Sequence, residues 1–445
     1  MRIAVVGAGH VGLVTCATWA SLGNEVVAVD SDQEKSALLQ AGVVPFYEPG
    51  LQELVTEGVE SGALRFTPDA ADAVAGAEVI FICVGTPPRA SGEASLAAVE
   101  RAAHEVAYHV TGPTVLVEKS TVPAGTAERI QRMLRHSRAP GAGQIDVVSS
   151  PEFLREGRAI RDSLHPSRVV VGGDSARALE VMRRLHQPLI DRGCAYIETD
   201  IETAELAKHA SNAFLALKIS YANALARICE RVGADVITVA DIMGADPRIG
   251  REFLNAGLGY GGYCFPKDLQ AFEVLSLKVG YAFPLLREVA RINEEAIEAA
   301  YLKVREGLWN LEEKRVALLG LSFKPETDDV RFSPALELAR RLLDEGAEVV
   351  GYDPQALSSA KDQVPGLLGA VDPYDAVSGA HCVVICTEWP QFRDLDLPRL
   401  RELMAYPLMV DGRNMFDPRA AADSGFLYHP AGRPFVEADR AWPRA

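Results

Sequence analysis

The stretch RIAVVGAGHVGLVTCATWASLGNEVVAVD, residues 2–30, predicts a strand, a tight turn, a helix and a second strand. Gly7, Gly9 and Gly12 have the GxGxxG spacing, and the second apolar run ends in Asp30. In such a unit the glycines permit the turn and the close approach of a pyrophosphate, which the helix N-terminus faces. Asp30 can accept hydrogen bonds from a ribose hydroxyl and would repel a 2′-phosphate. We therefore predict a dinucleotide-binding domain that prefers NAD to NADP.

The same alternation of apolar and amphipathic segments continues through the first 200 residues. Further strand candidates are EVIFICVG (78–85), TVLVEKS (114–120) and IDVVSSPEF (145–153). Strands that alternate with helices in this way predict a parallel sheet covered by helices.

Residues 201–232 contain neither glycine nor proline and predict one long helix. Apolar residues recur on it at helical spacing, namely Leu206, Ala210, Phe214, Leu217, Tyr221 and Leu225. A second strand–turn–helix–strand pattern then runs from RVALLGLSFKPETDD (315–329) to Asp353. We predict an α/β fold with two Rossmann-like doubly wound domains, at residues 1–200 and 301–445, joined by a central helical domain at residues 201–300. The tail from about His429 lacks periodicity and is predicted to be loose.

Composition restricts the possible partners. Lysine and arginine number 45 against 61 acidic residues, a net charge of −16, which argues against a nucleic-acid partner. Apolar runs are too short to span a bilayer, and the N-terminus reads as a strand rather than a signal peptide. Seven cysteines without a CxxC pair favour reduced thiols in a cytoplasmic protein, and Cys382 and Cys386 fit a buried strand. No metal site and no membrane partner are predicted.

One cysteine stands apart from the others. In GLGYGGYCFPKDLQ, residues 257–270, Cys264 precedes Pro266, which suits the first turn of the helix that follows. A helix N-terminus and a cation such as Lys267 lower the pKa of a thiol, whereas a nearby Asp268 would raise it. We expect the glycines to leave the sulfur open to a substrate. The sequence therefore predicts a reactive thiol at Cys264, with an inert core cysteine as the alternative.

Three polar residues elsewhere have both a structural and a functional interpretation. Lys208 and Asn212 are four residues apart and share a face of the long predicted helix. They are either solvated side chains or a pair that polarises a developing oxyanion. Lys324, in the turn of the second Rossmann-like pattern, is either a surface lysine or a ligand of a phosphate.

Two loops follow predicted strands of the first domain, Ser120–Thr126 and Ser149–Gly157. Doubly wound sheets bind ligands beyond the carboxyl ends of their strands. The second loop holds Glu152 and Glu156, four residues apart, which are either paired carboxylates or the solvated start of a helix.

Together these motifs resemble those of the UDP-glucose/GDP-mannose dehydrogenase family, over nearly the whole chain to about Asn414. The resemblance is carried by GAGHVG, GTPP, STVPAGT, PEFLREGRAIRDSLHPSRVVVG, ELAKHASNAFLALKISYANALA, RIGREFLNAGLGYGGYCFPKDLQA, LGLSFKPETDDVRFSPAL, CTEWPQF and DGRN. It implies oxidation of the C6 alcohol of a nucleotide sugar, most similarly UDP-glucose, to a carboxylate with two hydride transfers to NAD. It also implies that Cys264 forms a thiohemiacetal and then a thioester, which water hydrolyses.

The resemblance further implies a role for individual residues. The implied catalytic residues are Cys264, Lys208, Asn212, Asp268, Glu152 and Thr121. The implied cofactor-binding residues are Gly7, Gly9, Gly12, Val11, Asp30, Lys35, Thr86, Thr121, Glu156, Lys267 and Arg331. The implied substrate-binding residues are Glu152, Lys208, Asn212, Arg248, Phe253, Gly261, Phe323, Lys324 and Arg413.

In the resemblance Arg248 reaches the ligand of a neighbouring subunit, which implies a homodimer or a higher homo-oligomer built from dimers. The C-terminal Rossmann-like domain is implied to bind the nucleotide sugar. One departure from the family pattern is Ser150, where relatives often have asparagine, and it bears on the placement of Glu152.

Three alternatives remain open at this point. The chain is similar enough to admit another sugar-nucleotide 6-dehydrogenase, for GDP-mannose or a UDP-N-acetylhexosamine. A hydroxyacid dehydrogenase with a similar domain order would have no use for Cys264. A non-catalytic NAD-binding sensor predicts a degraded thiol site, whereas Cys264, Lys208, Asn212 and Asp268 are all present.

Overall fold

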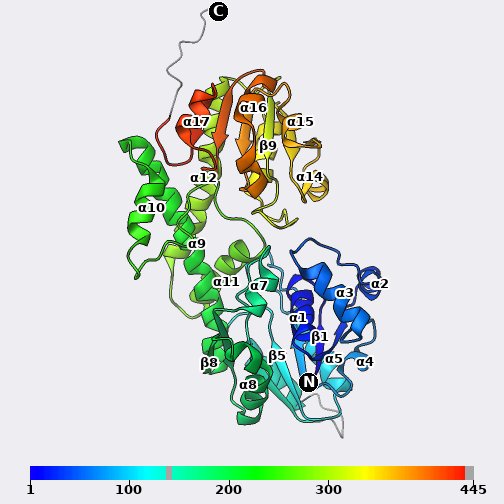
Figure 1. Cartoon of the computed structure of the whole chain (residues 1–445). Helices are drawn as coiled ribbons and strands as arrows, with labels where there is room; N and C mark the ends of the chain where they lie inside the picture. The colour runs from blue at the N-terminus through cyan, green and yellow to red at the C-terminus, as the bar shows by residue number, and fades with distance from the viewer. Residues whose placement is uncertain (137–142, 436–445) are drawn as a thin grey trace, which may run out of the picture. The chain divides into compact units, whose positions relative to one another are not determined.

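The computed structural model describes residues 1–136 and 143–435 (Figure 1). Its contacts divide the chain into two compact units, Met1–Ser211 with Gln270–Gly280, and Asn212–Leu269 with Tyr281–Ala445. Each unit contains one largely parallel sheet with helices packed on it, which confirms the predicted class of two Rossmann-like folds with helices between them in sequence. The three domain boundaries drawn from the sequence remain a prediction.

The sheet of the first unit has the strand order β3-β2-β1-β4-β5-β6-β7-β8. Its strands are β1 Arg2–Val6, β2 Glu25–Val29, β3 Leu64–Thr67, β4 Val79–Ile82, β5 Thr114–Glu118, β6 Ile145–Ser149, β7 Arg168–Gly172 and β8 Ala195–Thr199. Neighbouring strands are parallel except for β6 and β7, which meet antiparallel at Ser149 and Gly172. The order reverses between β1 and β4, and doubly wound sheets bind ligands at such a point.

Helices cover both faces of this sheet, which explains why its strands are almost continuously apolar. The helices are α1 His10–Ser21, α2 Gln33–Gln40, α3 Leu51–Ser61, α4 Ala70–Val74, α5 Ala97–His109, α6 Thr126–His136, α7 Ala159–Leu164 and α8 Ala176–Ile190. Alternate residues of β1 face opposite cores: Ile3 and Val5 pack with α1, α3 and α8, whereas Ala4 and Val6 pack with α4, α5 and α6.

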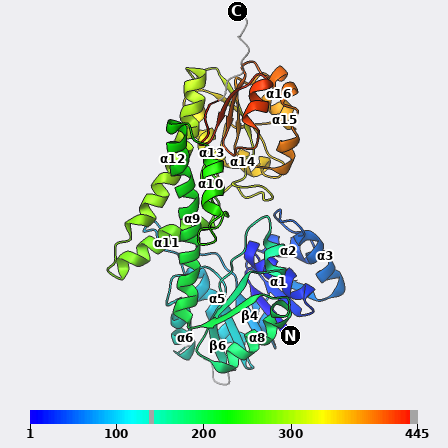
Figure 2. The same ribbon diagram turned by 60° about the vertical axis from the view of Figure 1, so that its left-hand side comes forward.

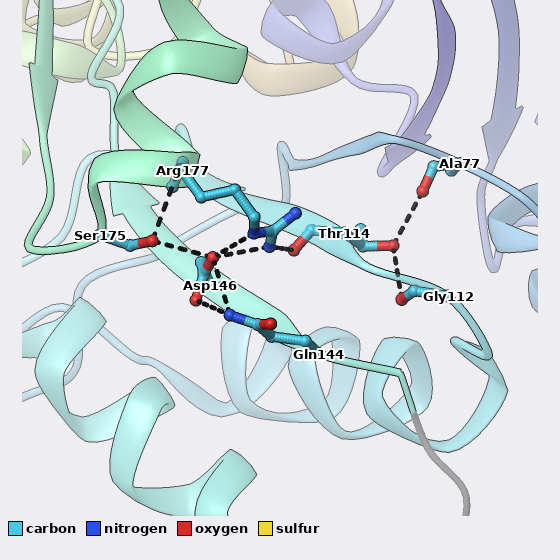
Figure 3. A network of polar contacts seen from close by, with 8 residues as sticks. Ala77, Gly112, Thr114, Gln144, Asp146, Ser175 and Arg177 are labelled. Carbon is cyan, nitrogen blue, oxygen red and sulfur yellow. Dashed lines mark hydrogen bonds and ion pairs between the residues drawn. The ribbon is translucent and has the colours of Figure 1, made fainter.

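The amino-terminal ends of the strands are fastened by a polar network around Asp146 (Figure 3). The Asp146 carboxylate accepts hydrogen bonds from Arg177 at 2.7 Å, Ser175 at 2.9 Å and Gln144 at 3.2 Å. Arg177 also donates to the carbonyl of Thr114 at 3.0 Å, so that one guanidinium ties α8 to both β5 and β6. Burial would raise the pKa of Asp146, but the bonds from Ser175 and Arg177 outweigh it and lower the pKa. Doubly wound sheets bind ligands at the carboxyl ends of their strands, whereas this network lies at the opposite ends. We therefore assign it a structural role.

The predicted long helix is confirmed as α9, Ile201–Val232. The helices that follow it are α10 Val236–Gly244, α11 Cys264–Lys278 and α12 Pro284–Leu308. In the second unit α9 runs beside α12 (Figure 2), where Ser220 donates to the Val289 carbonyl at 2.7 Å. The apolar side chains that recur on α9 are largely exposed, and apart from Ile201 at its start the buried residues of the helix are small or polar.

The sheet of the second unit is wholly parallel, with the order β11-β10-β9-β12-β13-β14. Its strands are β9 Arg315–Leu319, β10 Glu348–Tyr352, β11 Leu368–Gly369, β12 Cys382–Ile385, β13 Leu408–Asp411 and β14 Leu427–Pro430. Its helices are α13 Pro334–Asp344, α14 Leu357–Gln363, α15 Pro373–Val377, the 3₁₀ turn η1 Pro390–Asp394, α16 Leu397–Leu403 and α17 Pro418–Asp423. Cys382 and Cys386 are buried at 0% and 1% exposure, which confirms their predicted place in the core.

The prediction of a loose tail from His429 is wrong for the residues that the structure describes. His429 pairs with Val410 within β14, and Arg433 donates to Asp235 at 3.0 Å. The strand was missed because its four residues are too few to show periodicity. The rest of the predicted tail, residues 436–445, lies outside the described residues.

None of the helices within residues 1–136 and 143–435 has the length and apolar character that crossing a bilayer requires.

Strand β5 ends in a buried carboxyl group, Glu118, which is 1% exposed. Its Oε1 accepts the Ser120 N–H at 2.8 Å, yet burial raises its pKa from the ordinary 4.5 to about 8. A carboxyl with a raised pKa stabilises the fold at low pH and loses that contribution as pH rises through its folded pKa. We expect the free energy of unfolding to fall between pH 5 and 8, with up to about 1.4 kcal/mol per pH unit from Glu118.

Glu118→Gln should remove the Glu118 contribution to this slope, because an amide does not titrate, and should leave the contribution of Glu205, whose pKa burial raises to about 7. Urea unfolding of the variant and the parent at pH 5, 6, 7 and 8 measures the difference. Equal pH dependence in the two proteins would contradict the assignment of the slope to Glu118.

Candidate active site

The turn after β1 has the geometry that a pyrophosphate requires. Gly7 has φ +97°, and a Cβ on it would lie 2.6 Å from the Cys83 carbonyl oxygen. A Cβ on Gly12 would lie 1.9 Å from the Gly7 carbonyl oxygen, so helix α1 packs on the turn only with glycine there. A Cβ on Gly9 would meet no atom of the described chain within 4 Å, and no described side chain caps α1. The open N-terminus of α1 therefore fits an anionic ligand.

Asp30, at the end of β2, has the charge and the spare capacity to bind a hydroxyl. Its Oδ2 accepts the Ala8 N–H and the Lys35 ammonium, each at 2.7 Å, and Oδ1 accepts the Asp32 N–H at 2.9 Å. Burial opposes ionisation, but the hydrogen bonds from Lys35 and the backbone lower the pKa of Asp30 overall. A carboxylate offers about four acceptor sites. These contacts leave room for a ribose hydroxyl, so the turn and Asp30 together fit NAD.

The loops after β4 and β5 are joined by a hydrogen bond. Thr86, buried at 3% exposure, donates through Oγ1 to the Thr121 carbonyl at 2.9 Å. Thr121 itself is half-buried in the loop that precedes α6. Thr86 follows β4, which borders the reversal of strand order where a doubly wound sheet binds its ligand, and Thr121 follows the next strand, β5.

Glu152, in the loop after β6, forms a buried ion pair with Lys208 of α9. The Lys208 ammonium lies 2.7 Å from Glu152 Oε1, and Glu152 Oε2 accepts the Leu154 N–H at 2.6 Å. Lys208 is 3% exposed and Glu152 7% exposed, so the solvated-surface interpretation of Lys208 is wrong. The loop is not continued into a helix until Ala159, so the spacing of Glu152 and Glu156 does not place them on one helix face.

In the second unit, a buried cluster surrounds the start of α11. Cys264 is the first residue of α11 and is half-buried. Asp268, one turn later, is 0% exposed, and its two carboxylate oxygens accept hydrogen bonds from Asn212 and Lys267, each at 2.6 Å. Asn212 is therefore a buried hydrogen-bond donor and not a solvated side chain.

The glycines before Cys264 were predicted to leave space for a substrate, but they allow close packing of the chain. A Cβ on Gly261 would lie 2.3 Å from the Phe332 carbonyl oxygen, and one on Gly262 would lie 2.7 Å from the Phe323 ring. Gly262 also has φ +78° and donates its N–H to the Arg331 carbonyl at 3.0 Å. The expectation that the glycines leave space for a substrate is wrong at these positions, because the chain itself occupies that space.

The remaining predicted ligand-binding residues of the second unit lie on several loops. Arg331 is bound to Asp329 and stacks over the Tyr263 ring at 4.6 Å. The Lys324 ammonium lies 5.4 Å from the Phe323 ring centroid. Phe253 has an unusual φ of +66° for a side chain of its size. Arg413 donates to the Cys386 carbonyl at 2.7 Å and lies 3.2 Å from Glu388, and Arg248 is exposed and paired with Asp246.

The predicted residues thus fall into two sets. In the first unit are Gly7, Gly9, Val11, Gly12, Asp30, Lys35, Thr86, Thr121, Glu152, Glu156 and Lys208. In the second unit are Asn212, Arg248, Phe253, Gly261, Cys264, Lys267, Asp268, Phe323, Lys324, Arg331 and Arg413. Lys208 and Asn212 are linked by α9, which carries them in successive turns.

The second Rossmann-like sheet does not repeat the dinucleotide site. Asp353, which follows β10 as Asp30 follows β2, is 3% exposed. Its Oδ2 accepts hydrogen bonds from the Leu321 and Ser322 N–H groups and from the Trp389 indole at 3.1 Å. The carboxylate closes the turn of its own domain, in agreement with the missing glycine triplet.

Comparison with known proteins agrees with this geometry. Models of the UDP-glucose/GDP-mannose dehydrogenase family match the chain in three parts: the NAD binding domain at residues 1–190, the central domain at 202–295 and the UDP binding domain at 317–418. The chain belongs to this family. The predicted family resemblance is confirmed, and with it NAD as the cofactor and an NAD-dependent oxidoreductase as the class of enzyme.

Several family members are similar to the chain over its whole length. It is 44% identical to the UDP-glucose 6-dehydrogenase of Rhizobium meliloti over 438 residues, 98% of this chain and 100% of that protein. It is 42% identical to UDP-glucose 6-dehydrogenase TuaD of Bacillus subtilis, covering 98% of this chain and 94% of that one. A UDP-glucose dehydrogenase structure from Pyrobaculum islandicum matches with a TM-score of 0.90 and 37% identity, covering 97% and 98% of the two chains.

Four polar residues near the family's motifs were missed by sequence reasoning. Glu48 is buried, accepts the Gly157 and Ala159 N–H groups, and lies 3.0 Å from His10 Nε2. Glu205 and His209, on either side of Lys208, contact the loop that contains Thr121. Their spacing could have revealed these two residues, because Glu205 and His209 are four positions apart on the predicted helix and share one of its faces.

Removing one member of the buried ion pair should destabilise the first unit. Lys208→Met leaves the Glu152 carboxylate buried without its cation, and we expect a loss of about 3–5 kcal/mol in the free energy of unfolding. Arg132→Met, which breaks an exposed pair with Glu128, should cost less than about 0.5 kcal/mol.

The double variant Glu152→Gln/Lys208→Met separates the charge from the packing. It should recover much of the loss, since no unpaired charge remains. Urea unfolding of the four proteins measures these values. A Lys208→Met variant as stable as the Arg132→Met variant would contradict the burial of the pair.

Proposed function

We propose that the chain is a UDP-glucose 6-dehydrogenase, which oxidises the C6 alcohol of UDP-glucose to the carboxylate of UDP-glucuronate. The observation that carries the proposal is the buried Lys267–Asp268–Asn212 cluster in the first turns of α11, the helix that begins with Cys264. A hydroxyacid dehydrogenase would need no thiol there. The names of the relatives support UDP-glucose as the substrate.

Gly7, Gly9 and Gly12 would hold the NAD pyrophosphate and Asp30 a ribose hydroxyl, as their geometry allows. The chemistry that bound NAD supplies is acceptance of a hydride, once in each of two successive oxidations. In the first unit the other residues proposed for NAD are Val11, Lys35, Thr86, Thr121 and Glu156. In the second unit they are Lys267 and Arg331.

The proposed reaction uses the sulfur to make the second oxidation possible. Oxidation of the alcohol gives an aldehyde, which has no good hydride to release until a nucleophile adds to it. The Cys264 thiolate adds to C6, and the carbonyl oxygen becomes an oxyanion that Lys208 and Asn212 stabilise. Loss of hydride from C6 leaves a thioester. Attack of water on C6 then breaks the C–S bond, giving the carboxylate and returning the thiolate.

The two carboxylates differ in their proposed roles. Asp268, with both oxygens held by donors, is proposed to work with a water and Lys208 in deprotonating the alcohol and in hydrolysis. Glu152 is proposed to assist hydrolysis of the thioester, and its Oε1 is engaged by Lys208. The residues proposed to bind UDP-glucose are Glu152, Lys208, Asn212, Arg248, Phe253, Gly261, Phe323, Lys324 and Arg413.

We also propose a homodimer formed through α9. Phe214, Tyr221 and Ile228 recur every seven residues on it and are 61%, 48% and 55% exposed. An exposed apolar stripe at this spacing is typical of a helix that packs against another helix. The exposed guanidinium of Arg248 would then be available to the partner's ligand.

The ratio of NADH formed to UDP-glucose consumed tests the reaction. We expect two NADH per UDP-glucose, with UDP-glucuronate identified by mass spectrometry. Cys264→Ala should lower the rate of full oxidation by more than about 1,000-fold, because the nucleophile is removed. Cys194→Ala, at another half-buried cysteine, should retain the parent rate.

Failure of the parent enzyme to form NADH from UDP-glucose would overturn the choice of substrate, and GDP-mannose and UDP-N-acetylmannosamine should then be compared. Full oxidation by Cys264→Ala would overturn the covalent mechanism.

The dimer is tested by placing charges in the α9 stripe. Phe214→Glu and Ile228→Glu should each weaken self-association by at least about tenfold, since a carboxylate would be buried without a partner. Val371→Glu is the control, at a valine that is 85% exposed, and should leave the mass of the oligomer in solution unchanged. Sedimentation equilibrium measures the masses, and an unchanged dimer in both stripe variants would contradict this interface.

A further inference from the structure

Helix α9 holds the loop that contains Thr121 through two buried side chains. Glu205 Oε2 accepts the Gly125 N–H at 2.6 Å, and Oε1 accepts the Ala127 N–H at 2.8 Å. His209 Nε2 lies 2.9 Å from the Val122 carbonyl oxygen. Because a carbonyl only accepts, Nε2 carries the proton and donates it. Glu205 is 2% exposed and His209 is 1% exposed, so solvent does not compete for these bonds.

Glu205 acts on the loop as a cap supplied by another helix. Helix α6 begins at Thr126, so Gly125 and Ala127 present N–H groups at its N-terminus. Such groups have no partner within their own helix and favour an anion. A single carboxylate that accepts both of them fixes the exit of the loop, and a carboxylate–amide bond is stronger than one between neutral groups.

The loop is also held at its other end. Thr86 donates to the Thr121 carbonyl at 2.9 Å, and His209 donates to the next carbonyl, that of Val122. From Thr121 to Ala127 the backbone is therefore bound at four residues, two of them by Glu205. Hydrogen bonds to backbone groups fix the path of the loop, so the direction of the Thr121 side chain follows from them.

The same turns of α9 carry Lys208, which lies between the two clamping residues in sequence. Its ammonium is bound to Glu152 at 2.7 Å. One rigid helix thus sets the position of the Lys208–Glu152 pair and of the Thr121 loop. Pre-organisation of this kind favours reactions whose partners must be placed to within a fraction of an ångström.

We propose that Glu205 and His209 are positioning residues, which hold the Thr121 loop in register with Lys208 for the oxidation. This inference rests on the proposed function, because it assigns Thr121 to the reacting site. Neither side chain is proposed to touch the substrate or NAD. Burial raises the pKa of Glu205 to about 7, and Glu118 on β5 and Glu202 on α9 are the neighbouring carboxylates.

Kinetics with UDP-glucose and NAD test the inference through a double-mutant cycle. Glu205→Gln retains the size of the side chain but keeps only one acceptor oxygen, and we expect kcat to fall by about tenfold with little change in the KM for UDP-glucose. In a Thr121→Ala background the same change should have little further effect, because the clamp acts through Thr121. Glu202→Gln, at an exposed glutamate on the same turn of α9, should retain the parent kcat.

His209 gives an independent arm of the test, since its replacement leaves both Glu205 bonds in place. His209→Phe removes the donor and keeps a ring, and should lower kcat by several-fold. His209→Gln retains an N–H donor and should restore part of the loss. The positioning role would be overturned if Glu205→Gln and His209→Phe lowered kcat as much in the Thr121→Ala background as in the parent. A parent-like kcat in both single variants would overturn it as well.

Amide hydrogen exchange of residues 121–127 keeps the inference separate from the choice of substrate. Exchange there should be at least about tenfold faster in Glu205→Gln than in the parent or Glu202→Gln. Unchanged exchange would overturn the clamp even if another nucleotide sugar proves to be the substrate. A parent enzyme that does not oxidise UDP-glucose, with the exchange difference present, would overturn the proposed substrate and leave the clamp supported.

Discussion

The buried carboxylate of Asp268 is the constraint on which the candidate active site depends. A charge that is 0% exposed is tolerated only when it is paired and hydrogen-bonded, and here Lys267 and Asn212 supply one donor to each oxygen. Replacing such a pair by apolar residues often increases stability, so its presence is weak evidence for a structural role. The cluster lies in the first turns of the helix that starts with Cys264, so the proposed reaction at that cysteine explains its presence better than stability does.

The Lys208–Glu152 pair in the first unit is a second case of buried charges that are tolerated because they are paired. Both members are nearly inaccessible, and the glutamate lies in the loop beyond β6, at the edge where doubly wound sheets bind ligands. Helix α9 contributes Lys208 to one pair and Asn212 to the other cluster, in successive turns. The proposed reaction therefore requires an uninterrupted helix without glycine or proline, because a kink between these turns would change the spacing of the two residues.

Two sheets of similar topology illustrate how one pattern serves two purposes. Asp30 and Asp353 both follow the second strand of their units, yet their environments differ. Asp30 keeps part of its acceptor capacity and borders an uncapped helix, whereas Asp353 is saturated by backbone N–H groups and the Trp389 indole. Gly9 leaves space beside the first turn, and Gly7 and Gly12 let its backbone pack closely. In the second unit the N–H groups of Leu321 and Ser322 bind Asp353 and close the corresponding turn.

Sequence patterns revealed what depends on neighbours along the chain and missed what depends on neighbours in space. The bounds of α9, the strands around Gly7 and the place of Cys264 at a helix start follow from local spacing and from glycine and proline. The apolar residues of α9 were recognised, but periodicity alone could not tell that Phe214 and Tyr221 face outward while Lys208 and Asn212 are buried. The glycines before Cys264 show the same limit. Their spacing marked a special loop, yet the reason for Gly261 and Gly262 is the close approach of residues 323–332, more than sixty positions later in the chain.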